Sequence, residues 1–166
     1  MKMQGGRSIS IRNTTRADVP AVVHCLVEAF EEYRDSYSSG AFADTVLNAD
    51  ALKRRMESMC VLVAVTLSWQ VVGTIAYQIV NPGEGHIRGM AVLPQAQGLG
   101  VAKQLLDVAE SKLRDKECSR ITLDTTAPLN RAIHFYERKG FRRSGRVTDF
   151  FGMPLIEFEK VLASTC

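Results

Sequence analysis

The chain has 166 residues, and its 21 Lys and Arg against 18 Asp and Glu give a formal net charge of +3. Charges of both signs are interspersed along the chain, so the small excess does not indicate a nucleic-acid partner. A chain of this length buries roughly 70% of the surface that its unfolded form exposes, which is enough for one core. We therefore expect a flexible stretch over 1–7 and a single domain over 8–166.

The cysteines show no metal-binding pattern. Cys25, Cys60, Cys118 and Cys166 form no C-x-x-C pair and have no histidine at metal-ligand spacing, so we expect inert thiols and no metal. The N-terminus has no apolar signal region, and no apolar run approaches the ~20 residues of a membrane span. These features favour a cytoplasmic protein with no membrane partner.

The N-terminal part is predicted to form a strand and two helices. Alternation over 8–13 predicts the strand. Asp18 and Pro20 open the first helix, and the second is expected over 48–59. The segment 31–46 between them is rich in Ser, Asp and Tyr and is expected to be partly irregular. The apolar face of the first helix comprises Val19, Val22, Val23, Leu26 and Phe30.

Three strands and a long helix follow. Strands over 61–66 and 70–80 form a hairpin, and the next strand covers 85–93. A helix over 100–116 has Lys103 and Asp107 paired on its outer face. Its buried stripe comprises Val101, Leu105, Ala109 and Leu113.

The long helix returns the chain to a strand over 120–125. A strand–helix–strand crossover is right-handed, so the stretch 90–93 should run parallel to 121–125. A second helix includes 130–138, and strands over 141–147 and 155–161 complete the sheet. The sequence therefore predicts a mixed α/β fold.

A glycine loop joins the strand that ends at Leu93 to the long helix. Gly98 and Gly100 allow backbone N–H groups to turn inward, and the helix N-terminus adds unpaired donors, so the loop is suited to bind a pyrophosphate. An ordinary tight turn is the alternative. A P-loop needs a Lys-Ser or Lys-Thr pair after its second glycine, and a dinucleotide fingerprint needs glycine where Lys103 stands. Both of those motifs are excluded.

Two motifs together indicate a family. The Q-x-x-G-x-A pattern over 97–102 is followed by Asn130-Arg131-Ala132-Ile133-His134-Phe135-Tyr136-Glu137-Arg138-Lys139-Gly140-Phe141. The pair resembles the GCN5-related N-acetyltransferase (GNAT) family, with its acetyl-CoA pyrophosphate loop and its N-x-x-A-x-x-F-Y-x-x-x-G-F helix. The resemblance extends over 9–160, and its specific part is 90–141. It implies a mostly antiparallel sheet of six to seven strands with a splayed parallel central pair, flanked by about four helices.

The resemblance also implies the activity, which is direct transfer of an acyl group from CoA sulfur to an amine. A strand edge at 90–92 would pair with the pantetheine amides, and Asn130 matches an asparagine that contacts the pantetheine arm. Asn130 is alternatively a helix N-terminal residue that satisfies its own backbone. The expected acetyl-CoA-binding residues are Met90, Ala91, Val92, Gln97, Gly98, Leu99, Gly100, Val101, Ala102 and Asn130.

Two residues are candidates for proton transfer. Tyr136 matches the family tyrosine that protonates the leaving thiolate, although its position on the apolar face of its helix also suits a core residue. His86 resembles a histidine that some members carry, and its ordinary pKa suits a general base. Glu84 acting through water, an ordered water alone, and a surface role for His86 are the alternatives. Arg88 on the same strand face would favour a neutral His86.

The acceptor is expected to enter between the segment 31–46 and the turn 148–154. Asp149, Phe150 and Phe151 in that turn would form a small apolar pocket whose acid orients an ammonium, which points to a small-molecule primary amine. Alternatively, the phenylalanines close the end of the core or pack against a second copy in a homodimer. The opposite wall would be supplied by Tyr33, Tyr37, Phe42 and Asp44.

Two other functions remain open from the sequence. The chain could bind acyl-CoA as a sensor without turnover, or it could acetylate a protein or peptide. Tyr136 argues against the sensor, because a pure binder needs no hydroxyl at the leaving sulfur. Acetyl-CoA-dependent thiol release with amines and peptides would separate these functions.

Overall fold

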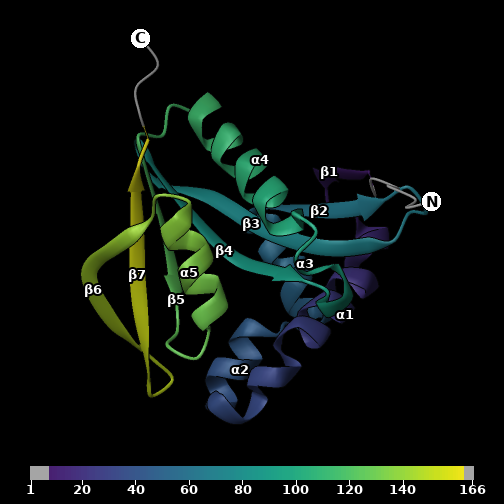
Figure 1. The fold of residues 1–166 in the computed structure, drawn as a ribbon, viewed down its shortest axis with the longest axis horizontal. Helices are drawn as coiled ribbons and strands as arrows, with labels where there is room; N and C mark the ends of the chain where they lie inside the picture. The colour runs from purple at the N-terminus through teal and green to yellow at the C-terminus, as the bar shows by residue number, and fades with distance from the viewer. Residues whose placement is uncertain (1–7, 163–166) are drawn as a thin grey trace, which may run out of the picture.

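The computed structural model describes residues 8–162 and contains one seven-stranded sheet with helices packed against it (Figure 1). The expected flexible stretch 1–7 and Cys166 lie outside the described residues. The elements are β1 (Ile9–Asn13), α1 (Val19–Phe30), α2 (Ser39–Thr45), α3 (Ala49–Ser58), β2 (Cys60–Thr66), β3 (Val71–Asn81), β4 (Glu84–Val92), α4 (Val101–Asp115), β5 (Arg120–Thr125), α5 (Asn130–Arg138), β6 (Arg142–Phe150) and β7 (Met153–Val161).

The strand order is β1-β2-β3-β4-β5-β7-β6. Every neighbouring pair is antiparallel except β4 and β5, which are parallel. This arrangement confirms the expected mostly antiparallel sheet with one parallel central pair. The crossover through α4 produces the parallel pair, as the strand–helix–strand pattern predicted.

The register of the parallel pair differs from the expectation. Residues 84–87 of β4 pair with 120–123 of β5, whereas 90–93 have no partner there. The cause is an extra residue in β4, since Ala76 pairs with Arg88 and Thr74 pairs with Ala91. Such a bulge bends its strand, and Gly89 accommodates it with a φ of 65°. Alternate backbone groups beyond Arg88 are therefore unpaired on the side that faces β5.

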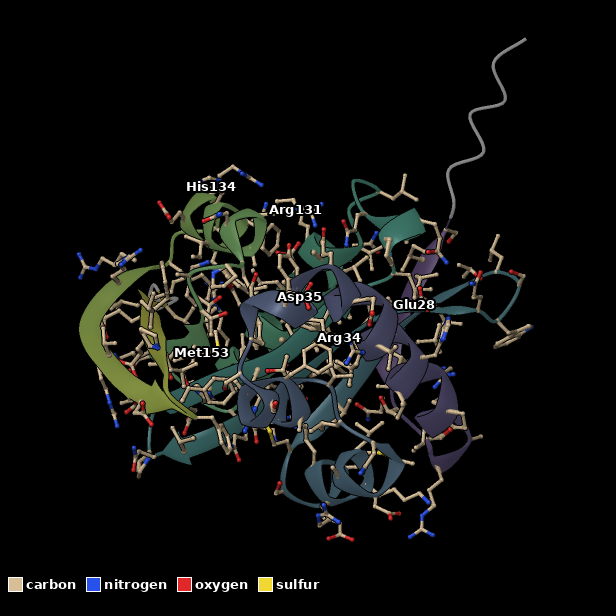
Figure 2. The ribbon with its side chains drawn as sticks, turned by 90° about the horizontal axis from the view of Figure 1, so that it is seen from below. Glu28, Arg34, Asp35, Arg131, His134 and Met153 are labelled. Atoms are coloured by element: carbon tan, nitrogen blue, oxygen red, sulfur yellow. The ribbon has the colours of Figure 1, made fainter. Side chains whose placement is uncertain are left out.

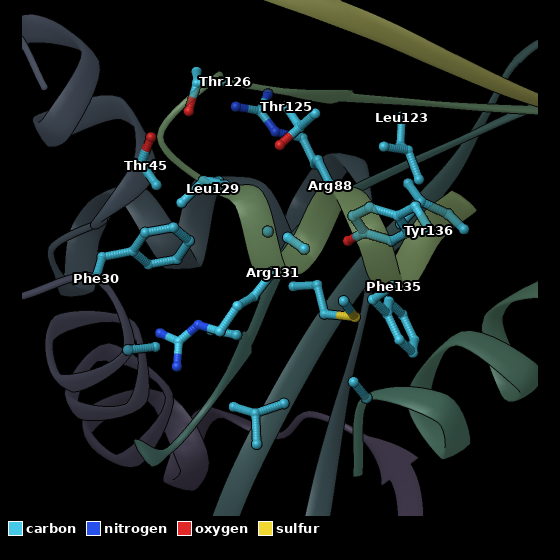
Figure 3. A pocket seen from close by; sticks show the side chains of 18 of the residues that line it. Phe30, Thr45, Arg88, Leu123, Thr125, Thr126, Leu129, Arg131, Phe135 and Tyr136 are labelled. Atoms are coloured by element: carbon cyan, nitrogen blue, oxygen red, sulfur yellow. The ribbon is translucent and has the colours of Figure 1, made fainter. Parts of the chain in front are cut away.

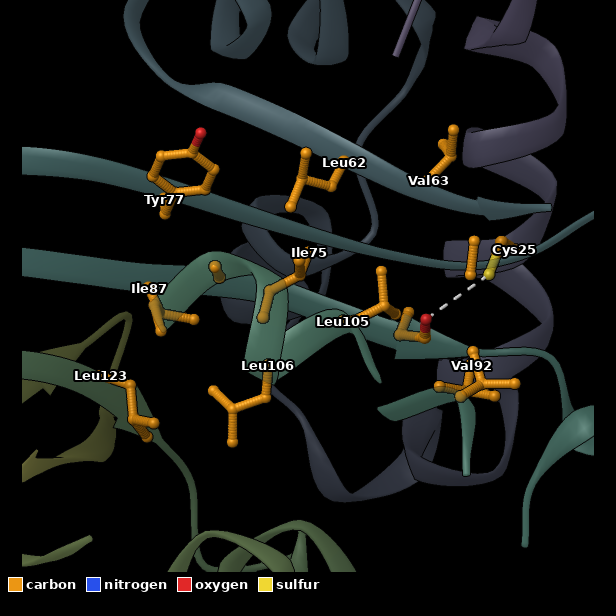
Figure 4. Close-up of a cluster of buried hydrophobic side chains, with 14 of the residues drawn as sticks. Cys25, Leu62, Val63, Ile75, Tyr77, Ile87, Val92, Leu105, Leu106 and Leu123 are labelled. Carbon is orange, nitrogen blue, oxygen red and sulfur yellow. Dashed lines mark hydrogen bonds between the residues drawn. The ribbon is translucent and has the colours of Figure 1, made fainter. Parts of the chain in front are cut away.

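The core lies where helices cover the sheet. All of β2 from Val61 to Val65 is buried, as is most of β3, which is the pattern of strands with both faces covered. The expected α4 stripe is buried, and Lys103 pairs with Asp107 at 2.7 Å on the outer side. Figure 4 shows Leu105 and Leu106 of α4 packed with Ile75 and Ile87 of the sheet.

The segment 31–46 is more regular than expected. It contains a 3-10 helix (Glu31–Ser36) and then α2, so five α-helices are present in residues 8–162 instead of about four. The Ser38 side chain accepts from the Ala41 N–H and caps α2. Figure 2 shows this segment, with Arg34 and Asp35 labelled, near Arg131 and Met153. Its tertiary contacts, described below, stabilise this order.

No helix within residues 8–162 has both the length and the apolar composition that crossing a bilayer requires.

Candidate functional site

A cavity of about 750 Å³ opens where β4 and β5 diverge (Figure 3). Its walls come from β4, the glycine loop, α5, the segment 29–45 and the β6–β7 turn. The volume lies in the range of sites for drug-sized ligands. The expected site residues that line it are His86, Met90, Ala91, Val92, Gln97, Gly98, Gly100, Val101, Ala102 and Tyr136.

Two expected cofactor-binding residues do not line this cavity. Leu99 is 50% exposed at the tip of the loop. Asn130 is the exposed first residue of α5, and Leu129 occupies the N-cap position before it. The cap position therefore holds a residue whose side chain makes no capping hydrogen bond.

The glycine loop has the geometry of an anion cradle. Gly98 and Gly100 have φ of 78° and 80°, and a Cβ at either would meet no atom within 4 Å. None of the backbone N–H groups from Gly98 to Lys103 donates to a backbone carbonyl within residues 8–162. These donors and the positive end of α4 are available to a pyrophosphate. The loop therefore fits the acetyl-CoA that the sequence suggested.

Tyr136 lies on the cavity wall, is 7% exposed and packs edge-on against Phe135 and Phe141. Its hydroxyl points into the cavity and makes no hydrogen bond to any residue within 8–162 (Figure 3). Burial raises the pKa of Tyr136, so the phenol stays protonated at neutral pH. The residue thus combines the packing role with the chemistry of a proton donor.

His86 is held between two side chains of β5. Its Nδ1 lies 2.8 Å from Thr122 Oγ1, and its Nε2 lies 3.5 Å from Asp124 Oδ2. Burial lowers the pKa of His86 and the Arg88 charge lowers it further, whereas Asp124 opposes the shift. The imidazole is therefore neutral at neutral pH, as a base requires. Burial also raises the pKa of Asp124.

A smaller polar cavity of about 300 Å³ shares His86 and Asp124 with the large one. Glu84 and Glu157 also line this small cavity. Glu84 does not line the large cavity, and Arg120 donates to it at 2.5 Å. His86 therefore lies closer to the candidate site than the alternative base Glu84 does.

The expected acceptor walls do meet. Ser38 Oγ donates to the Phe151 carbonyl at 2.8 Å, and Tyr33, Tyr37 and Phe150 line the cavity beside them. Asp149 and Phe42, which were also expected at these walls, lie elsewhere. Asp149 accepts from the Gly152 N–H within the turn, and the Phe42 ring lies under the Arg34 guanidinium. Neither lines the cavity, so the proposed acid of the pocket is not Asp149.

The structure adds side chains that sequence reasoning did not assign. Arg55, Asp124 and Arg131 line the cavity, as does Arg88, which was considered only for its charge. Arg131 donates to Gln97 Oε1 at 3.3 Å and to the Tyr33 hydroxyl at 3.1 Å, and it also pairs with Glu32. Arg131 lies four residues before Phe135, so the sequence places both side chains on one face of the helix, and this spacing could have indicated that Arg131 lines the same site. No local pattern marks Arg55.

The cysteines in the described part of the chain are free thiols. Cys25 lies against β4, where its Sγ donates to the Ala91 carbonyl at 3.8 Å (Figure 4). Burial raises its pKa to about 12, so it is inert near neutral pH. Over residues 8–162, no three His, Cys, Asp or Glu side chains are grouped as metal ligands.

Comparisons with known proteins agree with this geometry. A family model described as Acetyltransferase (GNAT) family matches residues 22–141. The chain is 33% identical over 67 residues to N-alpha-acetyltransferase 30 of Saccharomyces cerevisiae, covering 40% of this chain and 38% of that protein. It is 39% identical over 75 residues to a mycothiol acetyltransferase of Cellulomonas flavigena, covering 44% and 21%. The chain thus matches well under half of each relative's length.

Solved structures share the fold over nearly the whole chain. The PaiA N-acetyltransferase of Thermoplasma acidophilum, in complex with coenzyme A, has a TM-score of 0.78 and 20% identity, covering 93% of this chain and 99% of that one. A GNAT-family acetyltransferase of Staphylococcus aureus Mu50 has a TM-score of 0.76 and 18% identity, covering 94% and 100%. At these identities the likeness concerns the fold.

Proposed function

This chain belongs to the acetyltransferase (GNAT) family, and we propose that it transfers an acetyl group from acetyl-CoA to the primary amine of a small molecule. One observation carries the proposal. A single cavity brings together the anion cradle at 98–103, the unpaired edge of β4 and the Tyr136 hydroxyl. These groups are what a thioester donor with a pyrophosphate needs for binding and for departure of its sulfur.

Binding is assigned to backbone groups. When bound, acetyl-CoA supplies the acetyl thioester and the sulfur that leaves. The free N–H groups of the glycine loop would hold its pyrophosphate, and the β4 edge at 90–92 would pair with its amide-bearing arm as an added strand does. Backbone donors are rigidly placed, so they orient a ligand without loss of side-chain entropy.

His86 would take the proton from the acceptor ammonium. Thr122 Oγ1 lies 3.5 Å from the Gly85 carbonyl, and it can accept from His86 Nδ1–H. This tautomer leaves the lone pair on Nε2 for the proton. The Asp124 carboxylate, 3.5 Å from Nε2, would then stabilise the imidazolium that forms by its opposite charge. The small polar cavity beside this pair provides a route from the imidazole toward solvent.

Tyr136 would donate its hydroxyl proton to the leaving sulfur. Its raised pKa keeps the proton available, and its unpaired hydroxyl has no competing partner within residues 8–162. The rings of Phe135 and Phe141 hold it in place. A protein that only binds acyl-CoA has no need for this donor, so the site favours an enzyme over a sensor.

The acceptor end of the cavity supports a small molecule. Contacts between the segment 29–45 and the β6–β7 turn bound this end, with Tyr37 OH and Thr126 Oγ1 2.6 Å apart and Ser38 bonded to Phe151. A peptide amine is the second candidate, favoured by the similarity to a protein named N-alpha-acetyltransferase 30. A long peptide would need an open channel, whereas these contacts cross the cavity end.

Thiol release from acetyl-CoA tests the function, with small amines and short peptides compared in parallel. We expect turnover with small amines. Tyr136→Phe should lower kcat by roughly 100-fold while acetyl-CoA affinity stays nearly unchanged, because the ring remains and only the proton donor is lost. A drop of less than fivefold would assign the proton to another group, and preferential turnover of peptides would replace the small-molecule assignment.

A further inference from the structure

We propose that the acceptor amine carries a carboxylate, and that Arg55 and Arg88 bind this group at the acceptor end of the cavity. This inference rests on the proposed function and names the class of its substrate: a compact amino acid or a similar amino carboxylic acid. It follows from a guanidinium at the cavity wall that forms no ion pair within the described residues.

Arg55 is the principal observation. It projects from α3 into the cavity lining, and no carboxylate in residues 8–162 lies within 4.0 Å of its guanidinium. Burial lowers its pKa to about 10, and repulsion from Arg88 adds to this effect. The side chain still carries its charge at neutral pH. A partly buried cation without a partner is costly, and an anionic ligand would offset that cost.

The bulge in β4 makes room for this guanidinium. A Cβ at Gly89 would stand 2.7 Å from Arg55 Nη1, closer than real side-chain contacts allow. Gly89 also has a φ of 65°, which side-chain-bearing residues rarely adopt. The feature that separates β4 from β5 therefore also lets Arg55 lie beside Arg88.

The ion pairs at this wall leave out Arg55. Arg88 donates to Asp44 at 3.1 Å, so one carboxylate serves two guanidinium groups. Among the other acids of the cavity, Glu32 pairs with Arg131, and Asp124 lies beside His86 within the electrostatic reach of Arg88. Arg55 is therefore the guanidinium at this wall without an ion pair in residues 8–162, and a monoanionic ligand would provide one.

Thr125 supplies a second unpaired polar group. It lines the cavity, is 4% exposed, and its hydroxyl makes no hydrogen bond within residues 8–162. Figure 3 shows the Thr125 hydroxyl and the Arg88 guanidinium on the same side of the cavity. The oxygen itself is covered by neighbouring atoms, so the arginine guanidinium groups are the donors that an incoming carboxylate reaches directly.

The spacing along β4 suits one compact molecule. His86 and Arg88 both line the cavity and lie two residues apart before the bulge, so their Cα atoms are about 7 Å apart on one strand face. An amine at His86 and a carboxylate at the arginines therefore fit a short amino acid. Phe30, Tyr33 and Phe151 on the other walls favour an apolar side chain.

Matched acceptors test the carboxylate directly. The full chain is assayed for thiol release with L-amino acids that have apolar side chains, each compared with its primary amide and its decarboxylated amine. We expect kcat/KM for the acid to exceed that for the amide by at least about tenfold, because a charge-assisted hydrogen bond is lost with the amide.

Arginine variants identify the binding residues. Arg55→Met should raise KM for the acid by about 10- to 100-fold and leave KM for the amide and acetyl-CoA affinity unchanged. Arg55→Lys should raise it less, since the charge remains without the planar fork. Arg54→Met is the matched control, because Arg54 is the exposed preceding residue of α3 and does not line the cavity.

The failures are distinguishable. Equal kcat/KM for acid and amide in the unmodified protein would overturn the carboxylate inference and leave the proposed acetyltransferase function standing. Equal effects of Arg55→Met on acid and amide, with Arg55→Lys behaving alike, would assign Arg55 to packing and also overturn it. If acetyl-CoA binds but none of the tested amines causes thiol release, the proposed function itself is overturned.

Discussion

At the scale of single residues, burial keeps His86 deprotonated and Tyr136 protonated, and these states suit their proposed roles as base and acid. Burial disfavours a charged imidazolium at His86 and a charged phenolate at Tyr136, so both groups are neutral near neutral pH. A neutral imidazole accepts a proton and a neutral phenol donates one. The same physical cause therefore prepares both the base and the acid.

This pair leads to a pH prediction. The pKa of His86 is lowered from its ordinary 6.5, and the neutral base predominates at every pH above this lowered pKa. We therefore expect kcat/KM to rise as the pH increases through the lowered pKa. Asp124→Asn removes the charge that opposes the shift, so the limb should move to still lower pH. Rate profiles of both proteins check the direction.

His86→Ala is the decisive companion variant. It should abolish the acidic limb of the profile and lower the rate at neutral pH. If the limb persists unchanged in this variant, the titrating group is the acceptor amine or a chain of waters, and His86 is not the base.

At the scale of elements, the site depends on two irregular points around one strand. The bulge at Arg88 and Gly89 ends the pairing of β4 with β5, and the glycine loop then turns the chain into α4. The first exposes a strand edge, and the second directs N–H groups toward the same cavity. Regular continuation of either element would close the site.

The glycine loop yields a prediction with a matched control. Gly98→Val or Gly100→Val should lower acetyl-CoA affinity by about 100-fold, because loss of two hydrogen bonds to a charged group costs roughly 3 kcal/mol or more. Calorimetry on the folded variants measures it. Gly145→Val in β6 has similar strain, since Gly145 has a φ of 96° and open space around it, but lies outside the cavity. Unchanged affinity in the loop variants, or an equal loss in the control, would remove the loop from the binding site.

At the scale of the whole molecule, the cavity separates two parts of the sheet. β1 to β4 form one part and β5 to β7 the other, and they pair over only four residue positions, 84–87 with 120–123. Arg131 links the two sides through Gln97 and Tyr33. A ligand in the cavity would contact both parts and should stabilise the folded chain.

Thermal unfolding measures this stabilisation. At an acetyl-CoA concentration of about 100 times Kd, binding adds ≈ 2.7 kcal/mol, which for a chain of this size corresponds to a rise in Tm of roughly 5–11 °C. Gly100→Val at the same concentration should show little shift. A full shift in that variant would mean that the ligand stabilises the protein from another site.

Much of the fold followed from local sequence. The spacing of Val101, Leu105, Ala109 and Leu113 predicted the buried face of α4, and the crossover predicted the parallel pair. Helix periodicity and glycine turns depend on residues within a few positions of one another, so they can be read along the chain. The same holds for the glycine loop and for the position of Tyr136 on its helix.

Only the tertiary structure decided which side chains share the site. The β4 bulge depends on pairing with β3, and Asp124 reaches His86 because two strands far apart in sequence lie side by side. Arg55 enters the cavity from α3 because Gly89 leaves space, whereas Asp149 stays in its own turn. Register and side-chain approach depend on contacts between distant residues, which no local periodicity encodes. The sequence by itself therefore determined the elements and the glycine loop, and the packing of those elements determined the surroundings of His86 and which side chains line the proposed acceptor pocket.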